Sequence, residues 1–147
     1  MTVTQEAPAI GSVELYQQVQ QYYARQMQLL DSGRVEEWAQ TFTADGVFAA
    51  NAHPEPTVGR EAIAKVAGQV VADYNERRIQ RRHWLGMVNI ERQEGGSVFA
   101  RCYALVFETP HGGQAYVKAS TTCEDELVHE GGEWLVKHRL ITRDDLI

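Results

Sequence analysis

The hydrophobic period of the chain changes once, near residue 80, and this change constrains the fold more than any other feature. Before it, apolar residues recur at helical spacing over 13–30, 35–42 and 60–74. After it, long runs alternate between apolar and polar residues, as strands do, over 82–92, 97–109, 114–128 and 133–142. Helices first and strands afterwards predict an α+β domain, with three helices packed on one face of an antiparallel sheet.

Turn residues mark the ends of these elements. The strands are separated by "EGG", "PHGG" and "HEGG", and glycine supplies the positive φ that tight hairpins need. Upstream, "TADG" at 43–46 predicts a turn into a short strand at 47–50, and the two prolines of 51–59 predict a loop. We expect a flexible N-terminus over 1–11 and a single domain over 12–147.

Composition narrows the classes of partner. A net charge of −6 argues against nucleic acid as a partner, because binding it needs a basic face. No apolar window is long enough to span a membrane, and no leader with a charged start and an apolar run is visible. We therefore expect a cytoplasmic protein with no membrane partner, in which Cys102 and Cys123 are free, buried thiols.

The order of elements resembles the NTF2-like superfamily, and within it the SnoaL-like polyketide cyclases and the scytalone dehydratase branch. The segments that carry the resemblance are "LLDSGRVEEWAQTFTADGVF", "VGREAI" and "GGEWLVKHRLITRDD", and it covers nearly the whole chain. It implies a cone: three N-terminal helices on a curved antiparallel sheet, mixed at its edge, that encloses one pocket. It also implies a homodimer. Because this superfamily hosts many activities, function has to be read from the polar residues of the pocket.

His83 and Asp31 are the leading candidates for catalysis. "RHWLG" at 82–86 is similar to the strand that carries a catalytic histidine in the scytalone dehydratase branch, and "LLDSG" is similar to the helix end that carries its aspartate. The resemblance implies that His83 is the general base and acid and that Asp31 orients it. A buried histidine bonded to the backbone, and a polar helix stop at Asp31, are the structural alternatives. Alternation places on the face of His83 the side chains of Leu85, Met87 and Asn89.

Such a pair suits the removal of water from a β-hydroxy ketone. That reaction needs a base for the α-proton and an acid for the leaving hydroxyl, and an imidazole with a reference pKa of about 6.5 can serve as both. A neighbouring carboxylate fixes the tautomer and stabilises the imidazolium. The same pair could enolise a ketone for an aldol-type cyclisation. No metal-ligand spacing or nucleotide fingerprint occurs, so we expect a dehydratase or cyclase with no cofactor and no metal, acting on a small aromatic or polyketide-type intermediate.

Further residues are candidates for the same pocket. The resemblance adds His111, in "TPHGGQAY", and helical and strand positions add Tyr23 and His138, the latter on the face of Trp134 and Val136. An aromatic wall for a flat ligand would consist of Trp38, Phe42, Trp84 and Tyr103. The branch's pocket serine and asparagine would fall near Thr121 and Cys123, whereas its two pocket tyrosines have no counterpart. The alternative for His111 is a hairpin turn, and for the others it is ordinary core or dimer interface.

The basic segment "NERRIQRR" at 75–82 has two interpretations: a solvated turn, or a landing site for an anionic group of the substrate or of an acidic carrier protein. A second functional class also stays open, a non-catalytic ligand-binding or dimeric assembly module of a biosynthetic pathway, working with another pathway enzyme. The two classes differ at one point. A catalyst should show a closed pocket with His83 and Asp31 within hydrogen-bond reach, directly or through one water. A binder should show a filled core there, or a pocket without convergent polar groups.

Overall fold

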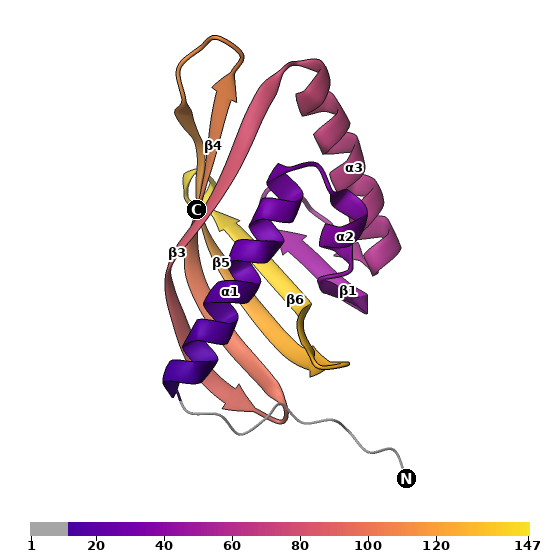
Figure 1. Cartoon of the computed structure of the whole chain (residues 1–147), viewed down its shortest axis with the longest axis vertical. Coiled ribbons are helices and arrows are strands. Elements are labelled where there is room, and N and C mark those ends of the chain that lie inside the picture. The colour runs from indigo at the N-terminus through magenta and orange to yellow at the C-terminus, as the bar shows by residue number, and fades with distance from the viewer. Residues whose placement is uncertain (1–11) are drawn as a thin grey trace.

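The computed structural model describes residues 12–147, so the flexible segment expected over 1–11 lies outside the described residues. The elements follow the expected order (Figure 1): α1 (Ser12–Asp31), α2 (Val35–Ala39), β1 (Phe42–Ala50), β2 (Thr57–Val58), α3 (Arg60–Glu76), β3 (Ile79–Glu94), β4 (Ser97–Pro110), β5 (Tyr116–Glu130), β6 (Glu133–Arg143) and a final 3-10 turn (Asp144–Leu146). Among the described residues, no helix is long and apolar enough to cross a membrane.

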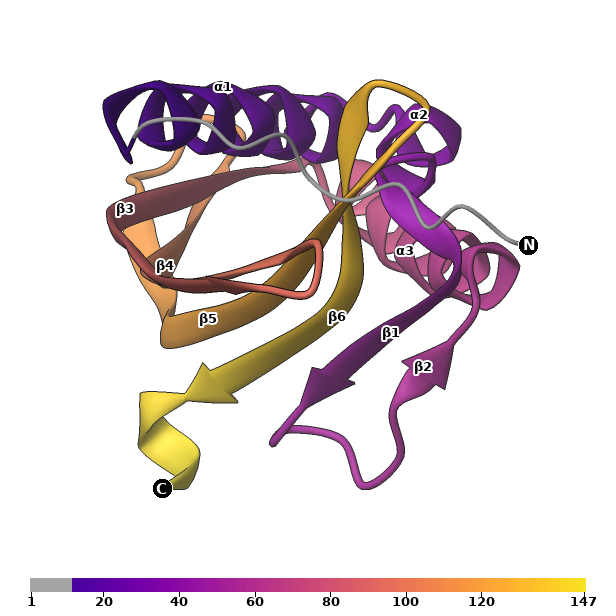
Figure 2. The same ribbon diagram turned by 90° about the horizontal axis from the view of Figure 1, so that it is seen from below.

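The six strands form one mixed sheet in the order β2-β1-β6-β5-β4-β3. Strand β1 runs parallel to β6, and every other neighbouring pair is antiparallel. Figure 2 shows the three helices on one side of the sheet and the strands curving away beneath them without closing into a barrel. The prediction of an α+β fold, with helices on one face of a curved sheet that is mixed at its edge, is confirmed.

The core lies between α1 and the concave face of the sheet. The apolar stripe of α1 repeats every four residues and buries Leu15, Val19 and Tyr23. The sheet contributes a matching set of buried apolar side chains, among them Val98, Leu127 and Val136. Burial of this kind is the dominant favourable term in folding, and it holds α1 against the sheet. Cys102 and Cys123 face each other across β4 and β5 as buried free thiols.

Two local expectations differ from the structure near β1. The strand begins at Phe42, so "TADG" lies inside it at an irregularity between Phe42 and Val47. The stretch expected to be a loop contains the two-residue strand β2, which pairs with β1 after both prolines have been passed. An irregular strand of this kind bends locally but still pairs with its neighbour. The polarity of the local sequence does not distinguish it from a turn.

Two bulges invert the alternation of side chains in β3 and β6. In β3 the register shifts between Gly86 and Asn89, and Met87 adopts a φ of 53°. Leu85 faces inward before the bulge and Val88 faces inward after it, while Met87 is 76% exposed. The expectation that Met87 and Asn89 share the face of His83 is therefore wrong, because one extra residue changes the phase of the strand.

Candidate functional site

Asp31 is the last residue of α1, and the sequence that follows explains why the helix stops there. Gly33 adopts a φ of 76°, a conformation that ordinary residues avoid. Its backbone N–H donates to the carbonyl of Leu30, and the N–H of Arg34 donates to that of Leu29, which closes the final turn of the helix. The carboxylate of Asp31 takes no part in this cap. It is free to reach the sheet.

Both carboxylate oxygens of Asp31 bind His83 on β3. Oδ1 lies 2.6 Å from ring atom Nδ1, and Oδ2 accepts the backbone N–H of His83 at 3.0 Å. The side chains of Asp31 and His83 are 6% and 16% exposed. Because a carboxylate can only accept, Nδ1 carries the proton, and in the neutral ring the lone pair lies on Nε2. Asp31 therefore bonds to the sheet and is more than a polar residue that ends the helix.

His83 lines a cavity of about 280 Å³. Its wall is largely apolar and comes from the helices and β1, with Leu30, Trp38, Phe48, Ile63 and Val70. Within residues 12–147, Nε2 of His83 has no hydrogen-bond partner. The arrangement thus presents a basic nitrogen to an apolar space, with its carboxylate partner behind it. An apolar cavity with a few convergent polar groups is typical of sites for small molecules.

Sequence reasoning missed most of the lining of this cavity, including three residues with aromatic or charged side chains. His53, in the exposed loop between β1 and β2, brings a second imidazole to its edge, and Phe48 supplies the aromatic wall on β1. Arg81 lines the cavity two residues before His83 on the same face of β3. Alternation could have separated Arg81 from the rest of the basic segment, whereas a loop residue such as His53 has no periodic signal.

Residues 11–140 match the family model of the SnoaL-like domain. The chain belongs to the SnoaL-like domain family. The resemblance stated from sequence is therefore confirmed, and it extends over most of the chain. No curated protein matches this SnoaL-like chain.

Several solved structures are similar to this SnoaL-like chain. Aln2 from a Streptomyces species is 34% identical with a TM-score of 0.84, and the match covers 93% of this chain and 96% of that one. ActVI-ORFA from Streptomyces coelicolor is 31% identical with a TM-score of 0.83, over 90% and 98% of the two chains. A protein from Catenulispora acidiphila, solved in complex with S-DNPA, is 39% identical with a TM-score of 0.79, over 91% and 96%.

The four aromatic residues expected to form a wall have separated. Trp38 lines the cavity. Phe42 is fully buried in the core, where its ring packs edge-on against the ring of Trp38 with the two centroids 5.0 Å apart. Trp84 and Tyr103 are 68% and 50% exposed, so neither contributes to this cavity. Residue 84 follows His83 directly, and adjacent residues of a strand point to opposite faces.

The indole N–H of Trp38 is buried and has no hydrogen-bond partner among the described residues. A buried donor without a partner loses the solvation it would have in water and gains nothing in return. A ligand oxygen that reached this atom would therefore bind favourably.

His111 and His138 both lie away from the cavity. His111 is in the turn after β4, where its backbone N–H donates to the carbonyl of Arg78. His138 is exposed on β6, because the register shifts between Glu126 and Leu127. That bulge turns Arg139 inward in place of His138, which corrects the expectation that His138 shares the face of the buried Val136.

Tyr23, Thr121 and Cys123 are buried, and none of them lines the cavity beside His83. Thr121 donates its hydroxyl to the carbonyl of Ala104. Tyr23 donates its hydroxyl to Asp125 at 2.8 Å, and the thiol of Cys123 lies 3.4 Å from the same carboxylate. Both belong to a separate polar network inside the core.

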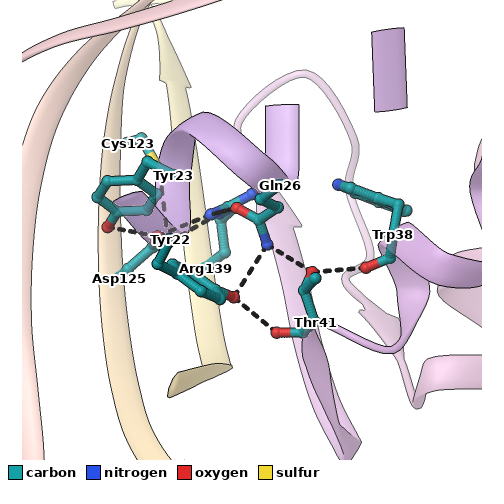
Figure 3. A network of polar contacts seen from close by, with 8 residues as sticks. All are labelled: Tyr22, Tyr23, Gln26, Trp38, Thr41, Cys123, Asp125 and Arg139. Carbon is teal, nitrogen blue, oxygen red and sulfur yellow. Dashed lines mark hydrogen bonds and ion pairs between the residues drawn. The ribbon is translucent and has the colours of Figure 1, made fainter. Parts of the chain in front are cut away.

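This buried network, shown in Figure 3, centres on an ion pair between Asp125 of β5 and Arg139 of β6. Arg139 binds both carboxylate oxygens at 2.8 Å and also donates to Gln26 of α1 at 2.7 Å. Gln26 in turn donates to Thr41 Oγ1 at 2.8 Å. The network thus connects α1, β5, β6 and the start of β1. Asp125 could have been found from sequence, since alternation places it among buried positions of β5.

Charges in the network stabilise one another. Burial alone would lower the pKa of Arg139, but the adjacent Asp125 carboxylate holds it well above its usual value. Burial, and then the charge of Asp125, raise the pKa of Tyr23, so this phenol keeps its proton and remains a donor. A permanently charged pair without access to the cavity is suited to holding layers together rather than to proton transfer.

A larger, open hollow of about 690 Å³ lies between α1 and the turn from β5 to β6. Its walls include Gln17, Gln18 and Gln21, and the Asp31–His83 pair is not part of it. Within the described part of the chain, no group of three or more His, Cys, Asp and Glu residues is placed to hold a metal ion. The smaller cavity is therefore the candidate site, because the convergent acid–base groups are there.

Proposed function

We propose that this SnoaL-like protein is an acid–base catalyst that removes water from a small aromatic or polyketide-type ketone, or closes a ring in it. The observation that carries the proposal is the orientation of His83. Its Nδ1 donates to Asp31 at 2.6 Å, and the residue lines a largely apolar cavity of about 280 Å³. His83 is the general base and acid in this proposal, and Asp31 is the residue that orients it.

The proposed reaction proceeds in two proton transfers. Nε2 of neutral His83 removes the α-proton of a β-hydroxy ketone, and the electron pair moves into the carbonyl to form an enolate. The imidazolium, stabilised by the Asp31 carboxylate, then donates the same proton to the β-hydroxyl. The carbon–oxygen bond breaks, water leaves and the conjugated ketone remains. In an aldol-type cyclisation the enolate instead attacks a second carbonyl of the same molecule, and the proton goes to the new alkoxide.

Two further observations support the proposal. The carboxylate of Asp31 is only 6% exposed, and partial burial of this kind strengthens the electrostatic stabilisation of the imidazolium by the carboxylate. A structure 39% identical to this chain was solved with S-DNPA bound, which supports small-molecule binding in this family. The homodimer and a carrier protein or pathway enzyme as partner stay predictions.

The test is a dehydration assay on a hydroxylated tetralone, a bicyclic β-hydroxy ketone that becomes a naphthol when it loses water. We expect His83→Gln to lower kcat by about 10²–10⁴-fold, the usual contribution of general acid–base catalysis. Asp31→Asn should also lower kcat, since the imidazolium then lacks its counter-charge. The matched control is His138→Gln, which removes an exposed imidazole outside the cavity.

An inactive Asp31→Asn beside a fully active His83→Gln would reject the pairing. A wild-type protein that binds the tetralone and its naphthol but turns over neither this substrate nor a cyclisable diketone would favour the ligand-binding module instead. Binding is measured by calorimetry on the same samples, so loss of folding and loss of chemistry are separated.

A further inference from the structure

Arg81 is a cation at the boundary of the candidate site. It lies on β3 two residues before His83, is half-buried, and lines both the cavity beside His83 and an adjoining hollow of about 160 Å³ that it shares with Asp31 and Tyr74. Among residues 12–147, no carboxylate oxygen lies within 4.0 Å of its guanidinium, and its side chain makes no hydrogen bond. Arginine is rarely buried without a partner, because removing its charge from water is costly. The neighbouring Arg82 is exposed on the opposite face.

The aromatic ring of Tyr74 holds the guanidinium of Arg81 in place. Its central carbon lies 4.4 Å from the centroid of the Tyr74 ring, a cation–π geometry. The hydroxyl of Tyr74 donates to the buried Glu108, which fixes the ring. Stacking of this kind orients a guanidinium while leaving its five N–H donors free. The group is thus preorganised to bind a planar acceptor.

Among the described residues that line the cavity beside His83, none carries a carboxylate. The adjoining hollow, which Arg81 also lines, has the carboxylate of Asp31 in its wall. The nearest carboxylate partner of the site, Asp31, is already engaged by two hydrogen bonds from His83. Burial lowers the pKa of Arg81, although the charges of Tyr74, Asp31 and Glu108 act against this effect. An arginine nevertheless remains protonated at neutral pH.

We propose that Arg81 binds a carboxylate of the substrate and so places the reacting carbon beside Nε2 of His83. This inference rests on the proposed function for the role of His83, but binding itself does not. The substrate class is therefore an aromatic or polyketide-type acid that carries its carboxylate apart from the acidic carbon. Arg81 is a substrate-binding residue in this proposal and transfers no proton.

The experiment is calorimetric titration with two matched probes, naphthoate and the neutral naphthamide. We expect the wild-type protein to prefer naphthoate by about tenfold or more, the factor that a charge-assisted hydrogen bond provides. Arg81→Gln should abolish this preference. Arg81→Lys, which keeps the charge but loses the planar fork, should weaken naphthoate and leave naphthamide unchanged. The matched control Arg82→Gln removes an equal charge from the outer face and should keep the preference.

Equal affinity of the wild-type protein for the two probes, or no binding of naphthoate at millimolar concentration, would overturn the proposal. So would an equal loss of preference in Arg82→Gln and Arg81→Gln, because a general surface charge would then explain it. His83→Gln separates this inference from the proposed function. Retained preference for naphthoate in a protein without turnover supports the Arg81 site while leaving the catalytic role of His83 to its own assay.

Discussion

At the scale of single residues, Asp125 and Arg139 show how costly polar groups are accommodated in this core. Their side chains are 0% and 3% exposed, and they bind each other through two hydrogen bonds. Tyr23 donates a further hydrogen bond to Asp125 Oδ2, and Gln26 Oε1 accepts a further one from Arg139 Nη2. A buried ion pair contributes little net stability over an apolar pair, but losing one partner leaves a charge uncompensated.

Removing either member of this pair should therefore destabilise the fold strongly. We expect Asp125→Asn and Arg139→Met each to lower the free energy of unfolding by about 3–5 kcal/mol. The double variant should lose clearly less than the sum, since neither charge is then left alone in the core. Urea unfolding of the wild type, both single variants and the double variant measures this coupling. Additivity within about 0.5 kcal/mol would mean that the two charges act independently.

At the scale of elements, helix α3 is joined to the sheet by a buried carboxylate. Glu108 of β4 accepts hydrogen bonds from Tyr116 of β5 at 2.5 Å and from Tyr74 of α3. Burial raises the pKa of Glu108, but the hydrogen bonds from Tyr116 and Tyr74 outweigh it and hold the pKa below its usual value. A carboxyl whose pKa is lower when folded stabilises the fold above its unfolded pKa, about 4.3, and loses this effect as pH falls through the folded pKa.

The stability difference between wild type and Glu108→Gln should therefore depend on pH. We expect the wild type to be more stable at pH 7, where Glu108 is ionised, and the gap to shrink near pH 3, where a protonated Glu108 resembles glutamine. Urea unfolding at both pH values measures the gap. Glu94→Gln, at a side chain 72% exposed, is the control and should show little difference at either pH. A gap that stays constant or widens in acid would contradict the ionised bridge.

The elements themselves were largely predictable from sequence, and the faces of the strands only in part. Helix α1 spans Ser12–Asp31 against an expected 13–30, because helical spacing is a local signal. His83 and Leu85 face inward as alternation requires, but the phase is lost at Met87 and again before His138. A bulge depends on how two strands pair, which the polarity of one strand does not encode.

The pairing of Asp31 with His83 joins residues 52 positions apart. No periodic pattern could indicate it, and the expectation came from a family resemblance. The cavity residues Arg81 and His53 were missed for opposite reasons. Arg81 was grouped with the basic segment 75–82, although strand alternation places it on the same face of β3 as His83. His53 lies in a loop, where only the tertiary fold decides what a side chain contacts.

At the scale of the whole molecule, the outer face of the sheet carries exposed apolar side chains. They come from three neighbouring strands and include Trp84, Met87, Tyr103 and Val117. Apolar side chains that are grouped on a surface, unlike isolated ones, often mark a site where another protein binds. The homodimer expected from the family resemblance would cover this face with a second copy.

Light scattering after size exclusion tests this prediction directly. We expect twice the chain mass of 16.6 kDa for the wild type. The double variant Trp84→Glu and Tyr103→Glu should be a folded monomer, because burying two carboxylates at an interface costs several kcal/mol. The matched control, Gln17→Glu and Gln21→Glu, adds the same two charges at exposed positions of α1 and should leave the mass unchanged. A wild-type monomer at all concentrations would refute the dimer.

Because β3 points His83 inward and Trp84 outward, Trp84 and the cavity-lining Trp38 lie in separate environments, and both are among the three native fluorophores of the chain. The indole of Trp38 borders the cavity and is 4% exposed, whereas that of Trp84 is 68% exposed on the opposite face. Emission from the first should respond to occupants of the cavity, and emission from the second to events on the outer surface. Replacing one of them at a time by phenylalanine leaves Trp134 as a background common to both variants. The two variants would then report separately, without any label, on filling of the interior and on association of chains.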